Sequence, residues 1–173
     1  EPWQNVLIAA TPGSAPTWRQ RMTAATLKGT VGSHRSGGRL HQFDGLDRFD
    51  VTEVSCVGVA PRLPGAVVHR VARLDPCDVV TVDGVRCTNV ARTLTDLGSV
   101  CGPTTVERAL DDVLRRDTNV RWLRETAERL RRPGQSGPFI LLDLLSAFER
   151  RGTVRGSWFE GLLERCLDHP DLA

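Results

Sequence analysis

The dipeptide Asp83–Gly84 constrains the fold of this chain more than any other feature of its sequence. It separates two β-prone runs, "DVVTV" and "VRCT". Both positions of a two-residue hairpin loop favour positive φ, which Gly adopts without strain and Asp tolerates. The sequence therefore predicts a tight antiparallel hairpin at this point.

Two further runs before this hairpin are also typical of strands. They are "VTEVSCVGV", whose side chains partly alternate, and "GAVVHRVAR", which follows Pro64–Gly65. Together with the hairpin they predict a small strand-rich middle of three to four strands. Before this middle, "NVLIAA" is typical of a short strand, and Thr17 and Ser33 are suitable N-caps for a pair of helices, the first over 18–28.

From Thr88 onward the apolar residues recur with a helical period. We expect a capping box of Thr104 and Glu107 to begin the second of these helices, because their spacing is S/T-x-x-E. The order of elements predicts an α+β fold in which a C-terminal helical half packs on or beside the sheet. The expected helices lie over 89–100, 104–116, 119–132 and 139–151, with a last one from about Ser157.

Composition excludes several classes of protein. The chain has 173 residues and no apolar run near the roughly 20 residues that cross a bilayer, so we expect no membrane partner. Its five cysteines contain no CxxC pair and its four histidines no HxH or HExxH pattern, so we expect reduced thiols, no metal site and no cofactor. These features are typical of a cytoplasmic protein.

Charge gives only weak information about partners. The formal net charge is +2, which alone is too small to indicate nucleic-acid binding. Of the 23 basic residues, Lys28 is the only lysine, so catalysis by a lysine has one candidate.

The segment "GSHRSGGRLHQF" (residues 32–43) concentrates polar side chains at the start of the second helix. Ser33 and His34 are adjacent, so we expect their side chains to point in different directions and Ser33 to act as an N-cap rather than a nucleophile. Two glycines either weaken the helix or allow another backbone to approach closely. A role in contacting a partner or a phosphate stays open for His34, Arg35, Arg39 and His41.

The predicted helix over 119–132 is rich in arginine. Guanidinium groups along one ridge are suited to phosphate, although a solvated face with ion pairs to Glu125 and Glu128 is the commoner explanation. The candidate contacts with nucleic acid or another partner on this helix are Arg121, Arg124, Arg131 and Arg132.

Three segments together suggest a family. They are "SHRSGGRLHQFDGL", "RLPGAVVHRVARLDPCDVVTVDGVRCTNVARTLTDLGSV" and "VERALDDVLRR". The chain resembles the AbiEi-like antitoxin proteins of bacteria, in the branch often fused to a Vsr-like endonuclease domain of the PD-(D/E)xK superfamily. The resemblance extends from about Thr17 to Gly161.

The resemblance implies a domain organisation. Residues 1–16 would be the end of a winged-helix-like segment that reads promoter DNA, residues 17–151 an AbiEi-like α+β core, and residues 152–173 the start of a nuclease-like domain. Glu160 matches a glutamate of the nuclease's first helix, although a capping box with Ser157 also explains it. The sequence has no D/E-x-K, and one carboxylate cannot hold the metal of such a site.

Two functions follow from the resemblance. The first is a non-catalytic core module of a DNA-associated regulator that opposes a nucleotidyltransferase-type toxin. The alternative is the structural middle of a Vsr-like DNA endonuclease, with Glu160 as the single catalytic candidate. Any binding of DNA by this chain is expected to be weak.

Overall fold

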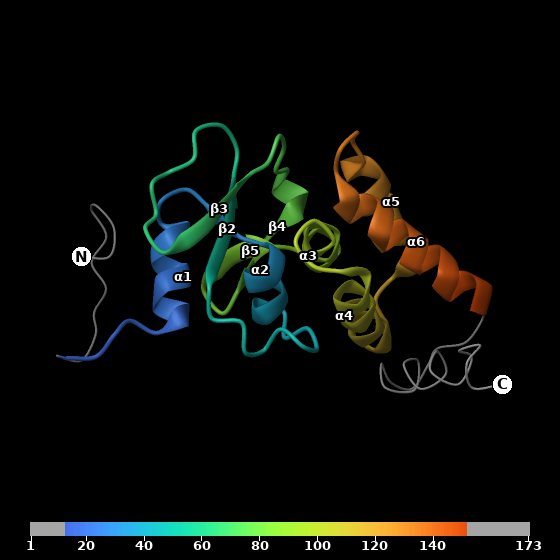
Figure 1. The fold of residues 1–173 in the computed structure, drawn as a ribbon, viewed down its shortest axis with the longest axis horizontal. Helices are drawn as coiled ribbons and strands as arrows, with labels where there is room; N and C mark the ends of the chain where they lie inside the picture. Colours follow the sequence, from blue (N-terminus) through green and yellow to red (C-terminus); the bar gives the residue numbers. More distant parts are fainter. Residues whose placement is uncertain (1–12, 152–173) are drawn as a thin grey trace.

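A computed structural model describes residues 13–151 of the protein (Figure 1). The strand expected at "NVLIAA", the helix expected from Ser157 and the candidate Glu160 lie outside these residues. The α+β class is confirmed. The helices are α1 (Trp18–Thr26), α2 (His34–Leu40), α3 (Val90–Leu97), α4 (Pro103–Arg115), α5 (Val120–Leu130) and α6 (Ser136–Arg151), with a short 3-10 helix η1 (Pro76–Asp78). The strands are β1 (Val31–Gly32), β2 (Thr52–Cys56), β3 (Ala66–Arg70), β4 (Val79–Val82) and β5 (Val85–Thr88).

The strands form one mixed sheet in the order β3-β2-β1-β5-β4. The predicted hairpin is confirmed: β4 and β5 pair antiparallel with Val82 opposite Val85, and Asp83 and Gly84 have φ of 46° and 81°. The four strands of the middle match the prediction. The fifth strand, β1, was missed because its two residues are too few to show a period.

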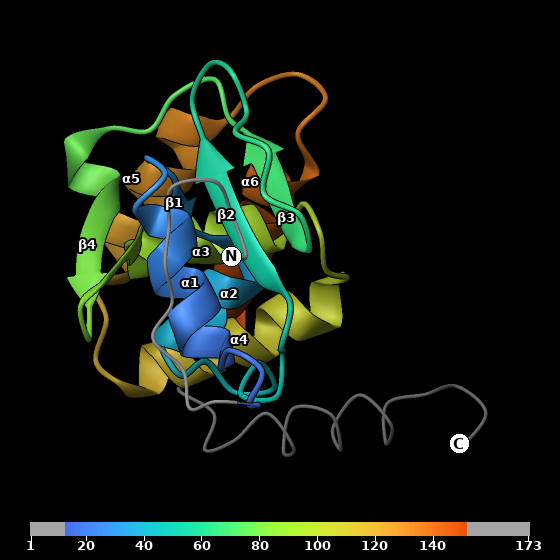
Figure 2. The ribbon, with the colours of Figure 1, turned by 90° about the vertical axis from the view of Figure 1, so that its left-hand side faces the viewer.

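The helices lie on both sides of the sheet. Figure 1 shows α1 on one side and α3 to α6 on the other, with α2 between the sheet and α3; Figure 2 shows α1 in front of the strands. One apolar core joins α1 to the sheet through residues such as Met22 and Val54. A second core joins α3 to α6 through residues such as Leu94, Leu110 and Leu145. The expected packing of the helical half beside the sheet is therefore confirmed.

The two glycines of α2 lie against neighbouring side chains, Gly37 against α3 and Gly38 against the chain that follows α2. A Cβ atom at Gly37 would lie 3.0 Å from the side chain of Thr93, and one at Gly38 would lie 2.2 Å from Leu46. These positions have no room for a larger residue. The two glycines were expected to weaken the helix or to let another backbone approach; in the structure it is side chains that approach them, not a backbone.

Several predicted helix ends differ from the structure. Thr17 caps α1 through a capping box with Gln20, as expected of an N-cap at this position. The predicted box of Thr104 and Glu107 is wrong, because α4 already begins at Pro103 with Gly102 in the N-cap position. Proline has its φ preset for the first helical position and needs no N–H there, so the helix starts one residue earlier.

Two further boundaries place arginines outside a helix. α6 begins at Ser136 rather than at 139, and α5 ends at Leu130 rather than at 132. Arg131 and Arg132 therefore lie in the connection between α5 and α6, and they do not share a helical ridge with Arg121 and Arg124. None of the helices in residues 13–151 has the length and apolar character needed to cross a bilayer.

Candidate functional site

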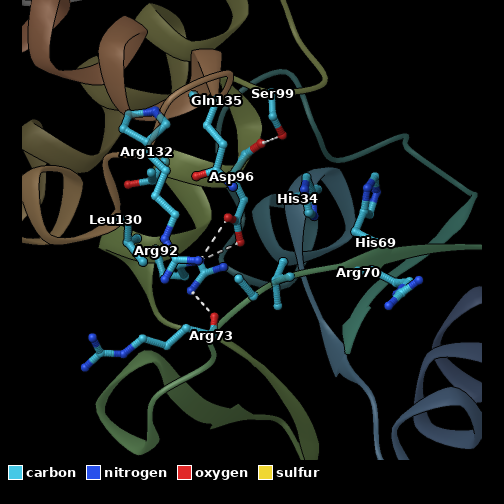
Figure 3. Close-up of a pocket in the computed structure, with 15 residues that line it drawn as sticks. His34, His69, Arg70, Arg73, Arg92, Asp96, Ser99, Leu130, Arg132 and Gln135 are labelled. Atoms are coloured by element: carbon cyan, nitrogen blue, oxygen red, sulfur yellow. Dashed lines mark hydrogen bonds and ion pairs between the residues drawn. The ribbon is translucent and has the colours of Figure 1, made fainter. Parts of the chain in front are cut away.

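A pocket of about 190 Å³ lies where the end of β3, the helix α3 and the start of α6 meet (Figure 3). His34 and His69 lie on one side of it and Arg132 on the other, with Asp96 between them (Figure 3). The polar side chains that line it come from two of the three segments quoted for the resemblance and from the connection before α6. They are His34, His69, Arg70, Arg73, Arg92, Thr95, Asp96, Ser99, Arg132 and Gln135.

The two histidines of the pocket are stacked. The centroids of the His34 and His69 rings are 3.6 Å apart, and the ring planes are inclined by 21°. His34 begins α2 and His69 lies on β3, so this contact joins two elements that are remote in the sequence. At this separation nothing fits between the rings, which means that the two imidazoles cannot act as acid and base on opposite sides of a reacting group.

The buried carboxylate of Glu53 accepts hydrogen bonds from the polar side chains next to the histidine pair. Glu53 lies on β2 with 0% of its surface exposed. Its carboxylate accepts hydrogen bonds from the Arg35 backbone N–H at 3.0 Å, from the Arg35 guanidinium at 3.0 and 3.1 Å, and from His69 Nε2 at 2.9 Å. Burial alone would raise the pKa of Glu53, but these hydrogen bonds lower it to about 2. Glu53 is therefore ionised, and His69 Nε2 carries a proton.

Glu53 was missed by sequence reasoning. The signal that could have found it is a carboxylate in the middle of the β-prone run "VTEVSCVGV". A charged residue is almost never fully buried unless it is paired, so its position predicts a partner. The sequence does not identify Arg35 and His69 as those partners, because both come from other elements.

The expectation for Ser33 is corrected by the structure. Ser33 occupies the N-cap position of α2, but its side chain makes no cap hydrogen bond. The Glu53 carboxylate receives the Arg35 N–H instead, because an ionised oxygen is the stronger acceptor. Ser33 Oγ lies 2.8 Å from Nδ1 of His34, although adjacent side chains were expected to diverge. The positive φ of 51° at His34 allows this contact.

The hydroxyl groups determine which nitrogen of His34 carries the proton. Ser55 Oγ donates to Ser33 Oγ at 2.7 Å, and Ser33 is fully buried. In residues 13–151 the Ser33 hydroxyl has one acceptor for its own proton, His34 Nδ1, so we assign the donor role in that contact to Ser33. The ring proton is then on Nε2. Burial, with a smaller contribution from His69, lowers the pKa of His34 to about 3, so the ring is neutral.

Buried ion pairs form the floor of the pocket. The Nε atom of Arg92 contacts both carboxylate oxygens of Asp96, at 2.9 and 3.1 Å, and its NH1 atom contacts Asp78 at 3.3 Å. Arg129 on α5 also binds Asp78, as well as Asp75 at 2.7 Å. Burial raises the pKa of Asp96 to about 6 despite the contact with Arg92. These pairs connect α5 to α3 and to the chain around η1.

The other candidates on α2 do not lie at the pocket. His41 contacts the Thr88 carbonyl oxygen at 2.7 Å, and burial lowers its pKa. Arg39 donates to the Phe49 carbonyl oxygen, and its guanidinium lies 4.1 Å from the centroid of the Trp18 ring. Of the four residues predicted on this segment, the structure brings together His34 and Arg35.

The arginines predicted around α5 are separated in the same way. Arg121 pairs with Glu125 and Arg124 with Glu149, each at 2.7 Å, as in a solvated ion-paired face. The Arg131 guanidinium lies 4.7 Å from the centroid of the Phe139 ring. Arg132 is the member of this group that lines the pocket.

The site is suited to binding. Ser33 is fully buried and hydrogen-bonded on both sides, so its hydroxyl is not presented to a substrate. In residues 13–151 no group of three His, Cys, Asp or Glu side chains is arranged to hold a metal ion. No family profile, no curated protein and no solved structure matches this chain.

Proposed function

We propose that this chain is the non-catalytic core module of a DNA-associated regulatory protein of the AbiEi-like, toxin–antitoxin type. One observation carries the proposal. Polar residues from two of the segments quoted above converge on one pocket: His34 from "SHRSGGRLHQFDGL", and His69, Arg92 and Asp96 from "RLPGAVVHRVARLDPCDVVTVDGVRCTNVARTLTDLGSV". These segments are among those on which the resemblance to this family rests. Polar groups that converge in a concave site are typical of binding sites.

The geometry of the site supports a role in binding rather than catalysis. The stacked imidazoles leave no space between them for a substrate, and the neighbouring hydroxyl of Ser33 is buried. In this proposal residues 17–151 form the regulatory core, working in the bacterial cytoplasm. Its partners are promoter DNA and a nucleotidyltransferase-type toxin.

Co-expression in bacteria tests the proposal. The chain is produced together with a nucleotidyltransferase-type toxin of the kind that AbiEi-like antitoxins oppose, and growth is followed. We expect the chain to restore the growth that the toxin arrests. A strain with an inactivated toxin serves as the control for the burden of expression. Persistent growth arrest despite ample folded chain would contradict the proposal.

A cleavage assay separates the proposal from the endonuclease alternative. Plasmid DNA is incubated with the chain and Mg²⁺ or Mn²⁺, and with a Glu160→Ala variant in parallel. We expect no cleavage above that of a mock preparation. Cleavage by the natural chain that disappears in Glu160→Ala would favour the Vsr-like endonuclease instead.

A further inference from the structure

His34 presents an unused hydrogen-bond donor to the pocket. Its side chain is 4% exposed, and its Nδ1 atom is occupied by Ser33. The proton on Nε2 has no hydrogen-bond partner in residues 13–151. Nε2 is also not one of the solvent-inaccessible polar atoms of these residues that lack a partner, so it is accessible from the pocket that His34 lines. A buried polar group without a protein partner costs free energy unless water or a ligand satisfies it. The Nε2–H group is therefore placed to bind something in the pocket.

The opposite side of the pocket is positively polarised. The first turn of α6 lines it through Gly137 and Pro138. Pro138 has no N–H, so this turn supplies the backbone N–H of Gly137, and the first amides of a helix have no intrahelical acceptor. The positive end of the helix dipole adds to the effect of this amide. Arg132, just before this turn, lines the pocket with a guanidinium that has no ion pair within residues 13–151.

The remaining charges of the lining are already neutralised or directed elsewhere. Arg92 is paired with Asp96 and Asp78, and Arg73 is paired with Asp75 at 2.6 Å. Figure 3 shows Arg70 extending away from the stacked histidines. Asp96 is the one carboxylate on the lining, and both of its oxygens contact Arg92. The charge of Arg132 is therefore left for an anion.

We propose that this pocket binds the phosphate group of a small ligand, held by the Nε2–H of His34, the guanidinium of Arg132 and the backbone N–H of Gly137. The volume of about 190 Å³ equals that of roughly six waters, enough for a phosphate group and a small attached part. Donors on two opposite sides match the tetrahedral oxygens of phosphate better than the planar pair of a carboxylate. This inference concerns the same pocket as the proposed function, but it requires neither a toxin nor promoter DNA, so phosphate binding and toxin neutralisation can fail separately.

Titration calorimetry with the full chain at constant ionic strength tests the inference. The probes are inorganic phosphate, adenosine monophosphate, adenosine and acetate. We expect saturable binding of phosphate and of the monophosphate, and none of adenosine or acetate. Tighter binding of the monophosphate would identify a phosphomonoester as the ligand, and equal or weaker binding would identify free phosphate. Absence of saturable phosphate binding, or equal binding of acetate, would overturn the inference.

Two neighbouring arginines provide a matched pair of variants. Arg132→Ala removes a charged donor from the pocket, and we expect it to weaken phosphate binding about tenfold or more. Arg131→Ala removes the same charge from the neighbouring residue, whose guanidinium lies over Phe139, and we expect less than a twofold change. Equal losses in the two variants would show that only net charge matters and would refute the site. His34→Phe retains an aromatic ring beside His69 and should also weaken binding, with thermal unfolding used to confirm the fold of each variant.

Discussion

At the scale of single residues, hydrogen bonds keep one group of the site ionised and burial keeps another neutral. Glu53 stays ionised because Arg35 and His69 surround its carboxylate with donors. His34 stays neutral because it is buried and its Nδ1 accepts from Ser33. Both pKa values are lowered, to about 2 for Glu53 and to about 3 for His34. Each group therefore lowers the free energy of unfolding as the pH falls, because the unfolded chain takes up the proton at a higher pH than the folded chain does.

This linkage predicts a pH-dependent difference between the natural chain and the variant His34→Phe. Between pH 6.5 and about 4.5, unfolded His34 is protonated while folded His34 is not. The free energy of unfolding of the natural chain should fall relative to the variant by about 1.4 kcal/mol per pH unit over this range. The raised pKa of Asp96 has the opposite effect on the pH dependence of the free energy of unfolding. Because Asp96 is present in both proteins, its effect cancels in the difference, which reports on His34. Urea titrations across this range measure it, and a difference independent of pH would contradict a neutral His34.

At the scale of elements, the contact between α3 and α6 depends on two glycines. A Cβ atom at Gly137 would lie 2.2 Å from the carbonyl oxygen of Thr95, and one at Gly98 would lie 2.8 Å from the Cα atom of Gly137. The backbones of the two helices thus approach more closely than any side chain allows. This approach also sets the position of the first turn of α6 beside the pocket.

The variant Gly137→Ala should therefore be strongly destabilised. The added methyl group has to push α6 away from α3, and overpacking of this kind costs about 2 kcal/mol or more. Gly102→Ala is the matched control, because Gly102 has a φ of −69° and nothing within 4 Å of its added Cβ atom. We expect the control to lose less than about 1 kcal/mol, the typical cost of alanine at an N-cap. Urea midpoints that are equal for the two variants would show that α6 can shift without cost.

At the scale of the whole molecule, many arginines form ion pairs within the fold and are not free to bind a partner. Guanidinium groups pair with carboxylates across elements, as in Arg35 with Glu53, Arg92 with Asp96 and Arg129 with Asp75. With a formal net charge of only +2, the chain has a weak positive field. Few cations are therefore left to contact the phosphates of a DNA duplex.

We accordingly expect weak and non-specific binding of duplex DNA by the chain. The dissociation constant should be no tighter than about 10⁻⁶ M at physiological salt, and it should rise steeply with salt concentration. Promoter and random duplexes should bind equally in fluorescence anisotropy. Replacing Arg131 and Arg132 together by Ala should lower the residual binding, because neither has an ion pair within residues 13–151. Tight and sequence-selective binding would mean that residues of this chain read DNA themselves.

The sequence by itself determined the features that depend on neighbouring residues. The hairpin at Asp83–Gly84, the cap at Thr17 and the helical periods after Thr88 follow from backbone preferences and from side chains a few positions apart. The α+β class follows from their order. At Thr104 two local signals compete, and the proline at position 103 determines where α4 begins.

Only the tertiary structure decided the site. Glu53 caps α2 from a strand 18 positions further along the chain, and His69 stacks on His34 from another strand. Arg132 reaches the same pocket from the connection before α6. These contacts depend on how the sheet and the helices pack, and the energy of a buried charge or donor depends on the partners that packing supplies. Neither the partners nor the burial can be read from residue types along the chain, because both are properties of elements that meet only in the folded protein.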